Sequence, residues 1–386
     1  MLRLLHTADV HLGARHADLG EQATAQRERQ FAAFRASVDL AIDEKVDLFL
    51  IAGDLFDSNV QPRRSVDRVA AELRRLIEAR IRTVLIPGTH DVYDRASIYR
   101  SYNLPALAGE GGPDFVTVLT PEQTSVRFEP LDLTVHAQVF ATKRAPHSPL
   151  AGLDVTADPS TWHVGLIHGS ISIPNQTEHD EVVITTEEIA ASKLDYLALG
   201  HWHSSSRGKA GRTVHAYAGA PEPVALDQDR AGNVLLVTLD LHNGKRDVQV
   251  EERRVGRTVF EKVEIDAAGI ASQPALIEQL AARANEDLVL DVRLIGIRPD
   301  ALDVRQEEIE AALAGRFLKI RVRDRSVPPL SEGPLPPEDT ILGAFVRDVE
   351  AAIAELEAAR DADGAAEARD VLRLGRLLLA GEEVTL

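Results

Sequence analysis

Five short polar clusters within the first 203 residues contain the residue types that bind metal ions and transfer protons. Each contains aspartate or histidine: Asp9-Val10-His11, Gly53-Asp54-Leu55-Phe56-Asp57, Gly88-Thr89-His90-Asp91, His168-Gly169 and Gly200-His201-Trp202-His203. A carboxylate has two oxygens and can bridge two divalent cations, while imidazole nitrogens can bind each ion separately. Together, the clusters predict a site for two metal ions.

Two such ions support a defined kind of chemistry. When they lie roughly 3.5–4 Å apart, they clamp a phosphoester, lower the pKa of a bound water and stabilise charge on the phosphate oxygens. A nearby histidine that binds no metal can protonate the leaving oxygen, and His90 is the candidate. Any one cluster alone also fits a capped strand end, a turn or a surface loop. The combination of all five, in this order, indicates phosphoester hydrolysis.

A short apolar run precedes every cluster, and these runs predict the strands that position the site. They are LRLLHTA (2–8), DLFLIAG (47–53), RTVLIPG (82–88), HVGLI (163–167) and DYLALG (195–200). Between the first three runs, apolar residues recur with helical spacing, which predicts βαβ units. Ligand sites in such sheets form beyond the carboxyl ends of the strands, where every cluster falls. The D-x-H spacing of Asp9 and His11 is expected to leave both side chains on one face of a strand end.

The ordered clusters resemble the pattern of the calcineurin-like metallophosphoesterases. Within that superfamily, HTADVHLG, IAGDLFDS, GLIHGS and LGHWHS are similar to the SbcD-type DNA repair exonuclease subunits, over residues 1–225. The resemblance implies an α/β fold, namely a four-layer α/β/β/α metallophosphoesterase sandwich with a small α/β capping domain and a helical C-terminal tail.

The resemblance also implies a role for each site residue. Seven residues would bind metal: Asp9, His11 and His203 the first ion, His168, His201 and Thr89 the second, and Asp54 both. His90 would be the acid or transition-state residue, and Asp91 would orient it. The family usually has Asn at position 89, whereas this chain has Thr, and a neutral hydroxyl is generally a poorer ligand than an amide oxygen. We therefore expect the second ion to be bound more weakly.

The other polar residues restrict the kind of metal. The chain contains no cysteine, which excludes thiolate metal sites and disulfides. Mixed oxygen and nitrogen ligands suit Mn²⁺, the expected cofactor, and also fit Fe²⁺ and Zn²⁺.

Asp57 is expected either to support the site or to begin a helix. Seven histidines fit no cluster and are expected in surface or ordinary core positions: His16, His136, His147, His163, His179, His215 and His242.

At 386 residues, the chain is long enough for two domains and a tail. Segments that alternate in hydropathy from about residue 213 predict antiparallel strands, which complete a metallophosphoesterase domain over 1–257. Residues 258–326 are expected to form the capping domain, and the Pro- and Gly-rich segment 327–337 a linker. Residues 338–386 should form a helical tail for partner binding. Within residues 316–325, Arg or Lys alternates with apolar residues, as in a half-exposed strand. The basic side chains are expected to form a solvated face, and the alternative is a face that contacts phosphate.

These features favour a DNA exonuclease or endonuclease in DNA repair. The resemblance implies that it is the nuclease subunit of a complex with an SbcC-like coiled-coil ATPase. Apolar tail residues with helical spacing favour docking on another helix: Ile341, Phe345, Val349, Ile353 and Leu356. A homodimer is left open. The alternatives are a small-molecule phosphodiesterase or protein phosphatase, and a DNA-tethering scaffold whose catalysis is weakened by Thr89.

The composition places limits on partners and location. The formal charge of −18 argues against broad, salt-driven binding of nucleic acid, although it allows a local basic patch. With 44% hydrophobic and 27% charged residues, the chain has the composition of a soluble globular protein. No apolar stretch approaches the roughly 18–20 residues that span a membrane, and the N-terminus lacks the pattern of a signal peptide. We therefore expect a cytoplasmic protein that does not bind membranes.

Overall fold

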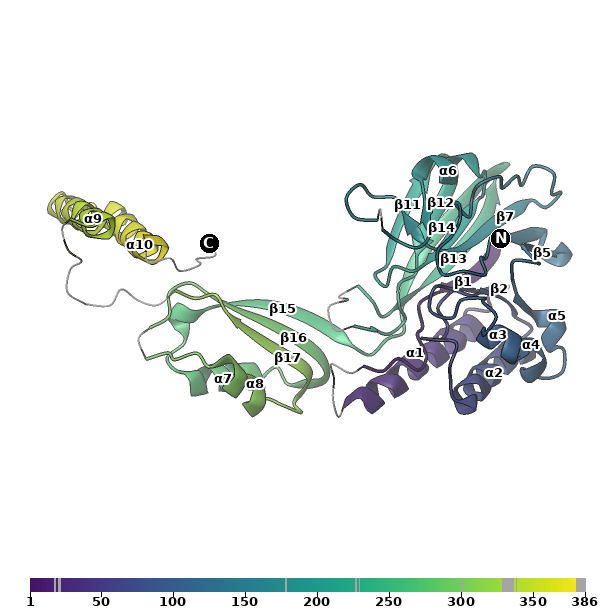
Figure 1. The fold of residues 1–386 in the computed structure, drawn as a ribbon, viewed down its shortest axis with the longest axis horizontal. Coiled ribbons are helices and arrows are strands. Elements are labelled where there is room, and N and C mark those ends of the chain that lie inside the picture. The colour runs from purple at the N-terminus through teal and green to yellow at the C-terminus, as the bar shows by residue number, and fades with distance from the viewer. Residues whose placement is uncertain are drawn as a thin grey trace. The chain divides into compact units, whose positions relative to one another are not determined.

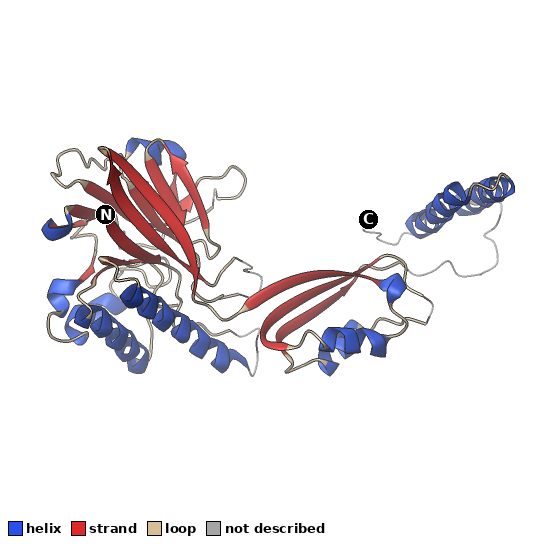
Figure 2. Cartoon of the chain, turned by 180° about the vertical axis from the view of Figure 1, so that it is seen from behind, coloured by secondary structure: helices blue, strands red, loops and turns tan. Residues whose placement is uncertain are grey.

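The computed structural model describes residues 1–386 except 17–18, 20–21, 178, 226–227, 229, 300, 328–336, 338 and 380–386. The chain divides into unit 1, Met1–Thr258, and unit 2, Val259–Leu386 (Figures 1 and 2). The domain boundary expected after residue 257 lies one residue before this division. The separation of capping domain, linker and tail stays a prediction, because most of the expected linker lies outside the described residues.

The first sheet of unit 1 contains the three N-terminal predicted strands. Its order is β14-β13-β1-β2-β3-β4, with β1 (Leu2–Thr7), β2 (Leu48–Ala52), β3 (Arg82–Ile86), β4 (Val116–Val118), β13 (Asn233–His242) and β14 (Lys245–Arg254). Strands β1 to β4 run parallel, while β13 pairs antiparallel with β1 and with β14. Helices α1 (Ala23–Asp43) and α2 (Arg63–Glu78) connect β1 to β2 and β2 to β3. They bury Phe34 and Leu73 against Phe49 and Leu85 on one face of the sheet, so the predicted βαβ units are confirmed.

The second sheet contains the two later predicted strands. Its order is β11-β12-β10-β7-β6-β5, with β5 (Ser125–Phe128), β6 (Leu133–His136), β7 (Trp162–His168), β10 (Tyr196–Gly200), β11 (Ser206–Ala210) and β12 (Thr213–Tyr217). One face packs against the first sheet, which buries Leu50, Val84 and Leu166 between the two. Helix α6 (Thr186–Ala191) packs Ile189 against Leu197 on the other face. The predicted order of helix, sheet, sheet and helix layers is confirmed.

One predicted strand pairs differently from the expectation. The segment at Thr213–Tyr217 was expected to be antiparallel, but β12 pairs parallel with β10. The preceding strand, β11, forms an antiparallel hairpin with β12 and reverses the chain, so β12 returns in the direction of β10. The expectation holds for β13 and β14, which belong to the first sheet. Shorter elements complete unit 1: α3 (Ile98–Ser101), α4 (Leu104–Leu107), α5 (Gly112–Phe115), η2 (Glu129–Leu131), β8 (Ser170–Ile171) and β9 (Val183–Ile184).

Unit 2 begins with the predicted succession of three strands and two helices. Its elements are β15 (Val259–Asp266), η3 (Ala267–Gly269), α7 (Gln273–Ala281), β16 (Asn285–Ile295), α8 (Gln306–Ala312) and β17 (Phe317–Asp324). The strands are parallel in the order β15-β16-β17, and Leu276 and Ile309 pack on Leu290. Helices α9 (Ile341–Ala358) and α10 (Ala362–Leu379) follow and pack against each other. No helix in the described part of the chain is long and apolar enough to cross a membrane.

The two sheets of unit 1 approach each other closely where β2 and β10 end. A Cβ atom added at Gly200 would lie 2.0 Å from the carbonyl oxygen of Ala52 and 2.9 Å from Nδ1 of His168. The backbone oxygen cannot move away without separating the strands. Glycine at 200 is therefore required by close packing, and this contact brings the polar clusters of the two sheets together.

We predict that Gly200→Ala destabilises unit 1. Overpacking against a fixed backbone atom should lower the free energy of unfolding by at least about 2 kcal/mol. The measurement is the urea midpoint followed by circular dichroism. Gly269→Ala is the control, because nothing lies within 4 Å of a Cβ atom at Gly269. If Gly200→Ala and Gly269→Ala unfold at the same urea concentration, close packing does not require glycine at position 200.

Candidate metal centre

Sharp left-handed turns aim the site residues toward one another. Asp9, His11, Asp54 and His201 have φ values of 51°, 49°, 49° and 99°. Such values are uncommon for residues other than glycine, and they concentrate at functional sites. Asp9 and His11 follow β1 and do not belong to it. Their side chains converge because of these turns, and not because alternate residues of a strand lie on one face, as was expected.

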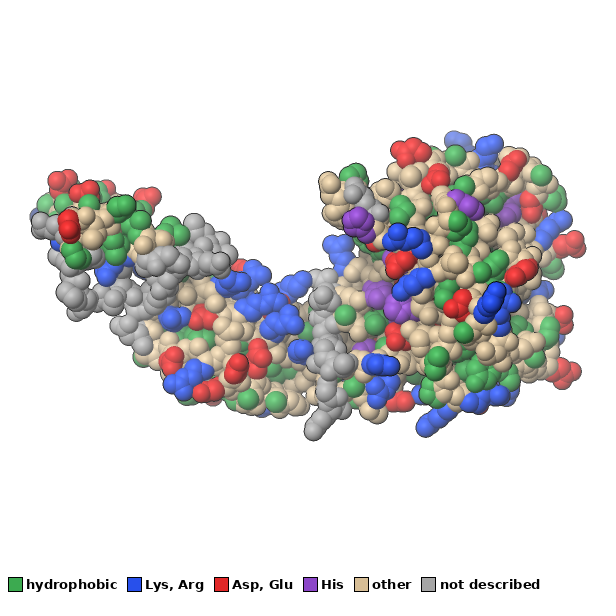
Figure 3. Space-filling model, in the orientation of Figure 1, with side chains coloured by type: hydrophobic (Ala, Val, Ile, Leu, Met, Phe, Trp, Pro, Cys, Tyr) green, Lys and Arg blue, Asp and Glu red, His purple; other side chains and the backbone are tan. Residues whose placement is uncertain are grey.

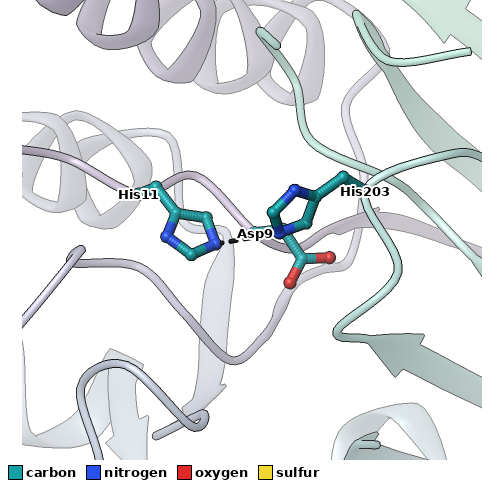
Figure 4. A group of neighbouring side chains, drawn as sticks. All are labelled: Asp9, His11 and His203. Atoms are coloured by element: carbon teal, nitrogen blue, oxygen red, sulfur yellow. Dashed lines mark hydrogen bonds between the residues drawn. The ribbon is translucent and has the colours of Figure 1, made fainter. Parts of the chain in front are cut away.

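The first group of donors is Asp9, His11 and His203, whose ligand atoms lie within 4.8 Å of one another. The side chains of His11 and His203 point toward each other, and Asp9 lies beside them (Figure 4). Nε2 of His11 is 3.1 Å from Nε2 of His203. Two imidazole nitrogens at this distance can share at most one proton, so at least one lone pair is available to a cation.

The second group is Asp9, Asp54 and His168. Nδ1 of His168 lies 2.9 Å from the carbonyl oxygen of Ala52, to which it can donate, and Nε2 lies 3.1 Å from Oδ2 of Asp54. This tautomer leaves Nε2 as the metal-binding nitrogen. Oδ2 of Asp9 is buried and accepts no hydrogen bond from the described residues. Because a buried oxygen without a partner is costly, these donors fit a bound cation.

Asp54 connects the two groups. Its Oδ2 atom lies 3.1 Å from Nε2 of His168 and 3.6 Å from Nε2 of His11. Its Oδ1 atom accepts a hydrogen bond of 2.7 Å from the backbone of His90. A Cβ atom at Gly88 would lie 2.3 Å from Oδ1, and one at Gly53 would lie 2.4 Å from the His168 ring. Gly88 therefore leaves the space that the Asp54 carboxylate occupies, and Gly53 leaves the space for the His168 ring that faces it.

Burial controls the charges in the centre. It raises the pKa of Asp9 to about 6, and it lowers the pKa of His203 to about 3 and that of His201 to about 4. Burial also acts to lower the pKa of His168, but the Asp54 and Asp9 carboxylates outweigh it and raise the value to about 9. Burial disfavours the charged form of Asp54, yet His168 and the other histidines hold its pKa below the ordinary value. His201 and His203 are therefore neutral, as a metal-binding imidazole must be, whereas His168 carries a proton that a divalent ion would displace.

Asp57 supports the centre from the same loop as Asp54. Its Oδ1 atom lies 3.1 Å from Nδ1 of His11, an arrangement that fixes the orientation of a ligating histidine. Its carbonyl oxygen lies 3.1 Å from Nδ1 of His90, whose side chain is 44% exposed. Asp57 does not begin a helix, because α2 starts only after the N-cap residue Pro62. That interpretation was wrong, and the alternative, support of the site, agrees with the structure.

Asp91 occupies a different place from the one expected. Its carboxylate accepts hydrogen bonds from the backbones of Gly88 at 2.7 Å and Phe56 at 3.1 Å, and from the Tyr99 hydroxyl at 2.5 Å. These bonds join the loops after β2 and β3. The Asp91 carboxylate thus links these two loops, while the His90 ring contacts Asp57, and the orienting role of Asp91 stays a prediction.

Two expected ligands of the second ion lie at the edge of the centre. The His201 ring packs edge-on against His168, with 5.3 Å between ring centroids, and its backbone donates to Oδ1 of Asp9 at 2.8 Å. Thr89 is buried and lines a cavity of about 30 Å³ together with His168. The His201 side chain belongs to none of the converging His and Asp groups of the described residues. The ligand roles of both stay predictions.

One contact of the first group could not be predicted from the sequence. The Gln228 side-chain amide lies 2.5 Å from Nδ1 of His203, and its oxygen accepts from the backbone of Val224 at 3.0 Å. Gln228 follows no predicted strand and belongs to no polar cluster. Only the folded loop after β12 brings it to the centre.

The comparison with known proteins agrees with this geometry. The family model for calcineurin-like phosphoesterases matches residues 2–205, a range that contains all five clusters and more than half of the chain. The chain belongs to this family. Its similarity to relatives of known name is modest in identity and extends over most of the chain.

Three relatives illustrate that similarity. The DNA double-strand break repair protein Mre11 of Aeropyrum pernix is 28% identical over 272 residues, which cover 69% of this chain and 64% of that protein. The protein of the same name from Halobacterium salinarum is 28% identical over 330 residues, 84% of this chain and 78% of the relative. The uncharacterized metallophosphoesterase YhaO of Bacillus subtilis is 26% identical over 294 residues, which cover 72% of this chain and 66% of that protein. The match thus spans slightly less than two thirds of the first and last of these relatives.

We predict that Asp57→Asn weakens metal binding. Loss of the carboxylate that orients His11 should reduce affinity for Mn²⁺ roughly 10–100-fold. The measurement is a Mn²⁺ titration of the metal-free protein. Asp114→Asn, which changes an exposed carboxylate, should bind as the wild type does. Equal affinities in all three proteins would show that Asp57 does not position a ligand.

Proposed function

We propose that this protein is a two-metal-dependent phosphodiesterase that cleaves DNA, as an exonuclease or endonuclease, in DNA repair. The observation that carries the proposal is the position of Asp54, whose Oδ2 atom faces a histidine from each donor group. Family membership supports phosphoester chemistry, and the names of the Mre11 relatives support DNA repair.

The residues of the centre would have two roles, metal binding and proton donation. Asp9, His11 and His203 would bind one divalent ion, His168, His201 and Thr89 the other, and Asp54 both. Two bound Mn²⁺ ions, or Fe²⁺ or Zn²⁺, would supply a hydroxide nucleophile and neutralise the charge that develops on the phosphate. His90 is exposed at the rim and is anchored through Nδ1 to the Asp57 carbonyl. It would give its proton to the leaving oxygen.

The exposed side chain of His90 leaves the rim of the centre within reach of a substrate. Figure 3 shows histidine side chains at the surface of this unit, between basic and acidic side chains. The same view shows Lys and Arg side chains over unit 2. Two basic residues of unit 2, Arg293 and Arg323, form ion pairs with Glu264 at 3.1 Å and Asp291 at 3.3 Å. A phosphate would have to compete with the carboxylates for these two arginines. A solvated strand face therefore explains the basic residues at least as well as DNA binding does.

The substrate class separates the proposal from its alternatives. The Mn²⁺-loaded protein should hydrolyse linear duplex or single-stranded DNA. A small-molecule phosphodiesterase would act on bis-p-nitrophenyl phosphate and leave both DNAs intact, and a scaffold weakened at Thr89 would bind DNA without cleaving any of the three. Either result would overturn the proposed function.

We predict that Asp54→Asn abolishes hydrolysis while the fold stays intact. The loss of one shared charge weakens both ions, and each ion is worth several kcal/mol of transition-state stabilisation. The rate on DNA should fall at least roughly a hundredfold, in an assay at saturating Mn²⁺, whereas Asp114→Asn should cleave normally. Near wild-type rates in Asp54→Asn would rule out its bridging role.

His90→Ala should retain metal and lose turnover. Removing a general acid typically costs roughly 10²–10⁴-fold in rate. Elemental analysis should find the wild-type metal content, and the DNA cleavage rate should fall by that amount. If the variant has lost metal as well, His90 is a ligand and its assignment as the acid fails.

We also propose that the helical tail binds a coiled-coil ATPase of the SbcC kind. Part of the apolar row expected on its surface packs within the hairpin, since Phe345 lies against Gly375. Other apolar side chains remain open to a partner helix: Ile341 is 79% exposed, Val371 48% and Leu378 60%. Such exposed residues on neighbouring helices suit docking on another helix.

Full-length protein with Val371→Glu and Leu378→Glu should fail to co-purify with the ATPase, because two charges would be buried in an apolar contact. The control is Val60→Glu, which changes an apolar residue of unit 1 that is 87% exposed. Co-purification should be measured with both proteins purified. Undiminished binding by the tail variant would remove the tail from the interface.

A further inference from the structure

Another group of potential metal ligands lies in unit 1, apart from the two groups of the metal centre, and contains two histidines that were expected in surface or core positions. His136 is the last residue of β6, His163 is the second residue of β7, and Asp158 lies in the loop before β7. One ligand atom from each lies within 4.8 Å of the other two. The group shares no residue with the centre built around Asp54.

The register of the second sheet brings the two histidines together. His136 pairs with Gly165, and Thr134 pairs with His163, so the histidines are diagonal neighbours on one face of β6 and β7. The alternate residues of β6, Leu133 and Val135, belong to the core between the two sheets. The histidines therefore project from the opposite face, away from that core.

The two facing ring nitrogens are about as far apart as two nitrogens that bind the same ion. Nε2 of His136 lies 3.2 Å from Nδ1 of His163, and the two residues are only 8% and 5% exposed. In a tetrahedral site with Zn–N bonds of about 2.0–2.1 Å, two ligating nitrogens lie about 3.4 Å apart. Since the two facing nitrogens can share at most one proton, at least one of them presents a lone pair to the other.

The third donor is held in place by the backbone. Oδ1 of Asp158 accepts a hydrogen bond of 2.8 Å from the backbone of Ser160, and the Asp158 backbone donates to Val155 at 3.2 Å. The Ser160 hydroxyl lies 2.8 Å from that of Thr134, which ties this turn to β6. Asp158 thus reaches the histidines from a turn whose shape does not depend on a metal.

We propose that His136, His163 and Asp158 bind one Zn²⁺ ion, with water as the fourth ligand. Two imidazoles and one carboxylate are a donor set that zinc accepts in proteins. The ion would close the base of the segment 137–161, which is described throughout and contains no helix or strand. Residues 138–140, 142 and 143 of this segment line the cavity that Thr89 and His168 also line. The zinc would thereby fix one wall of the neighbouring metal centre, because it joins the two ends of a long loop.

The competing explanation is a hydrogen bond between two neutral imidazoles, and zinc binding separates the two. Full-length wild type, His136→Gln/His163→Gln and the control His215→Gln are stripped with chelator and dialysed against buffered Zn²⁺. His215 is a partly buried histidine of β12 in the same sheet and lies outside the group. Elemental analysis should find one Zn²⁺ fewer per chain in the double variant than in the wild type and the control. Equal zinc content in all three proteins overturns the proposal.

Two further measurements decide the matter if the double variant folds poorly. Asp158→Asn keeps an oxygen for the Ser160 backbone but loses the charge, and should weaken this Zn²⁺ at least about tenfold. Zn²⁺ should also slow proteolysis within 137–161 in the wild type and in His215→Gln, and not in Asp158→Asn, because the ion holds both ends of the loop. Unchanged affinity in Asp158→Asn, or protection that is the same in all variants, contradicts the site.

Discussion

The structure of unit 1 depends on the burial of two carboxylates, Asp9 and Asp54, where its two sheets meet. Both side chains are almost completely excluded from solvent, and unpaired buried charge is strongly unfavourable. The fold compensates with His168 and with backbone N–H groups of His201 and His90, and a divalent cation would complete the compensation. The close approach at Gly200 and the space left by the other glycines follow from the need to bring these groups together.

Folding and metal binding are coupled because neither sheet holds the centre alone. The first sheet supplies Asp9 and Asp54 from the ends of β1 and β2, and the second supplies His168 and His203 from the ends of β7 and β10. An ion that binds ligands from both sheets binds only the folded unit and therefore stabilises it. The same reasoning applies on a smaller scale to the proposed zinc ion, whose ligands frame the loop 137–161.

The sequence was sufficient for the five strands before the polar clusters and for the positions of those clusters, because each cluster directly follows an apolar run that forms its strand. It was insufficient for contacts that depend on pairing between distant segments. The direction of β12 follows from its hairpin with β11, and the meeting of His136 with His163 follows from the register of β6 and β7. Asp57 was ambiguous because a carboxylate after a strand looks the same whether a helix or a loop follows. Such features emerge only from the tertiary structure.

The central claim is that the Asp54 carboxylate is shared by two metal ions. The most direct measurement is a crystal structure of the Mn²⁺-loaded protein, with the ions located from their anomalous scattering. We expect two peaks about 3.5–4 Å apart, with Asp54 in the coordination sphere of both ions and His11 and His168 each bound to one. A single ion at full occupancy, or two ions of which only one contacts Asp54, would contradict it.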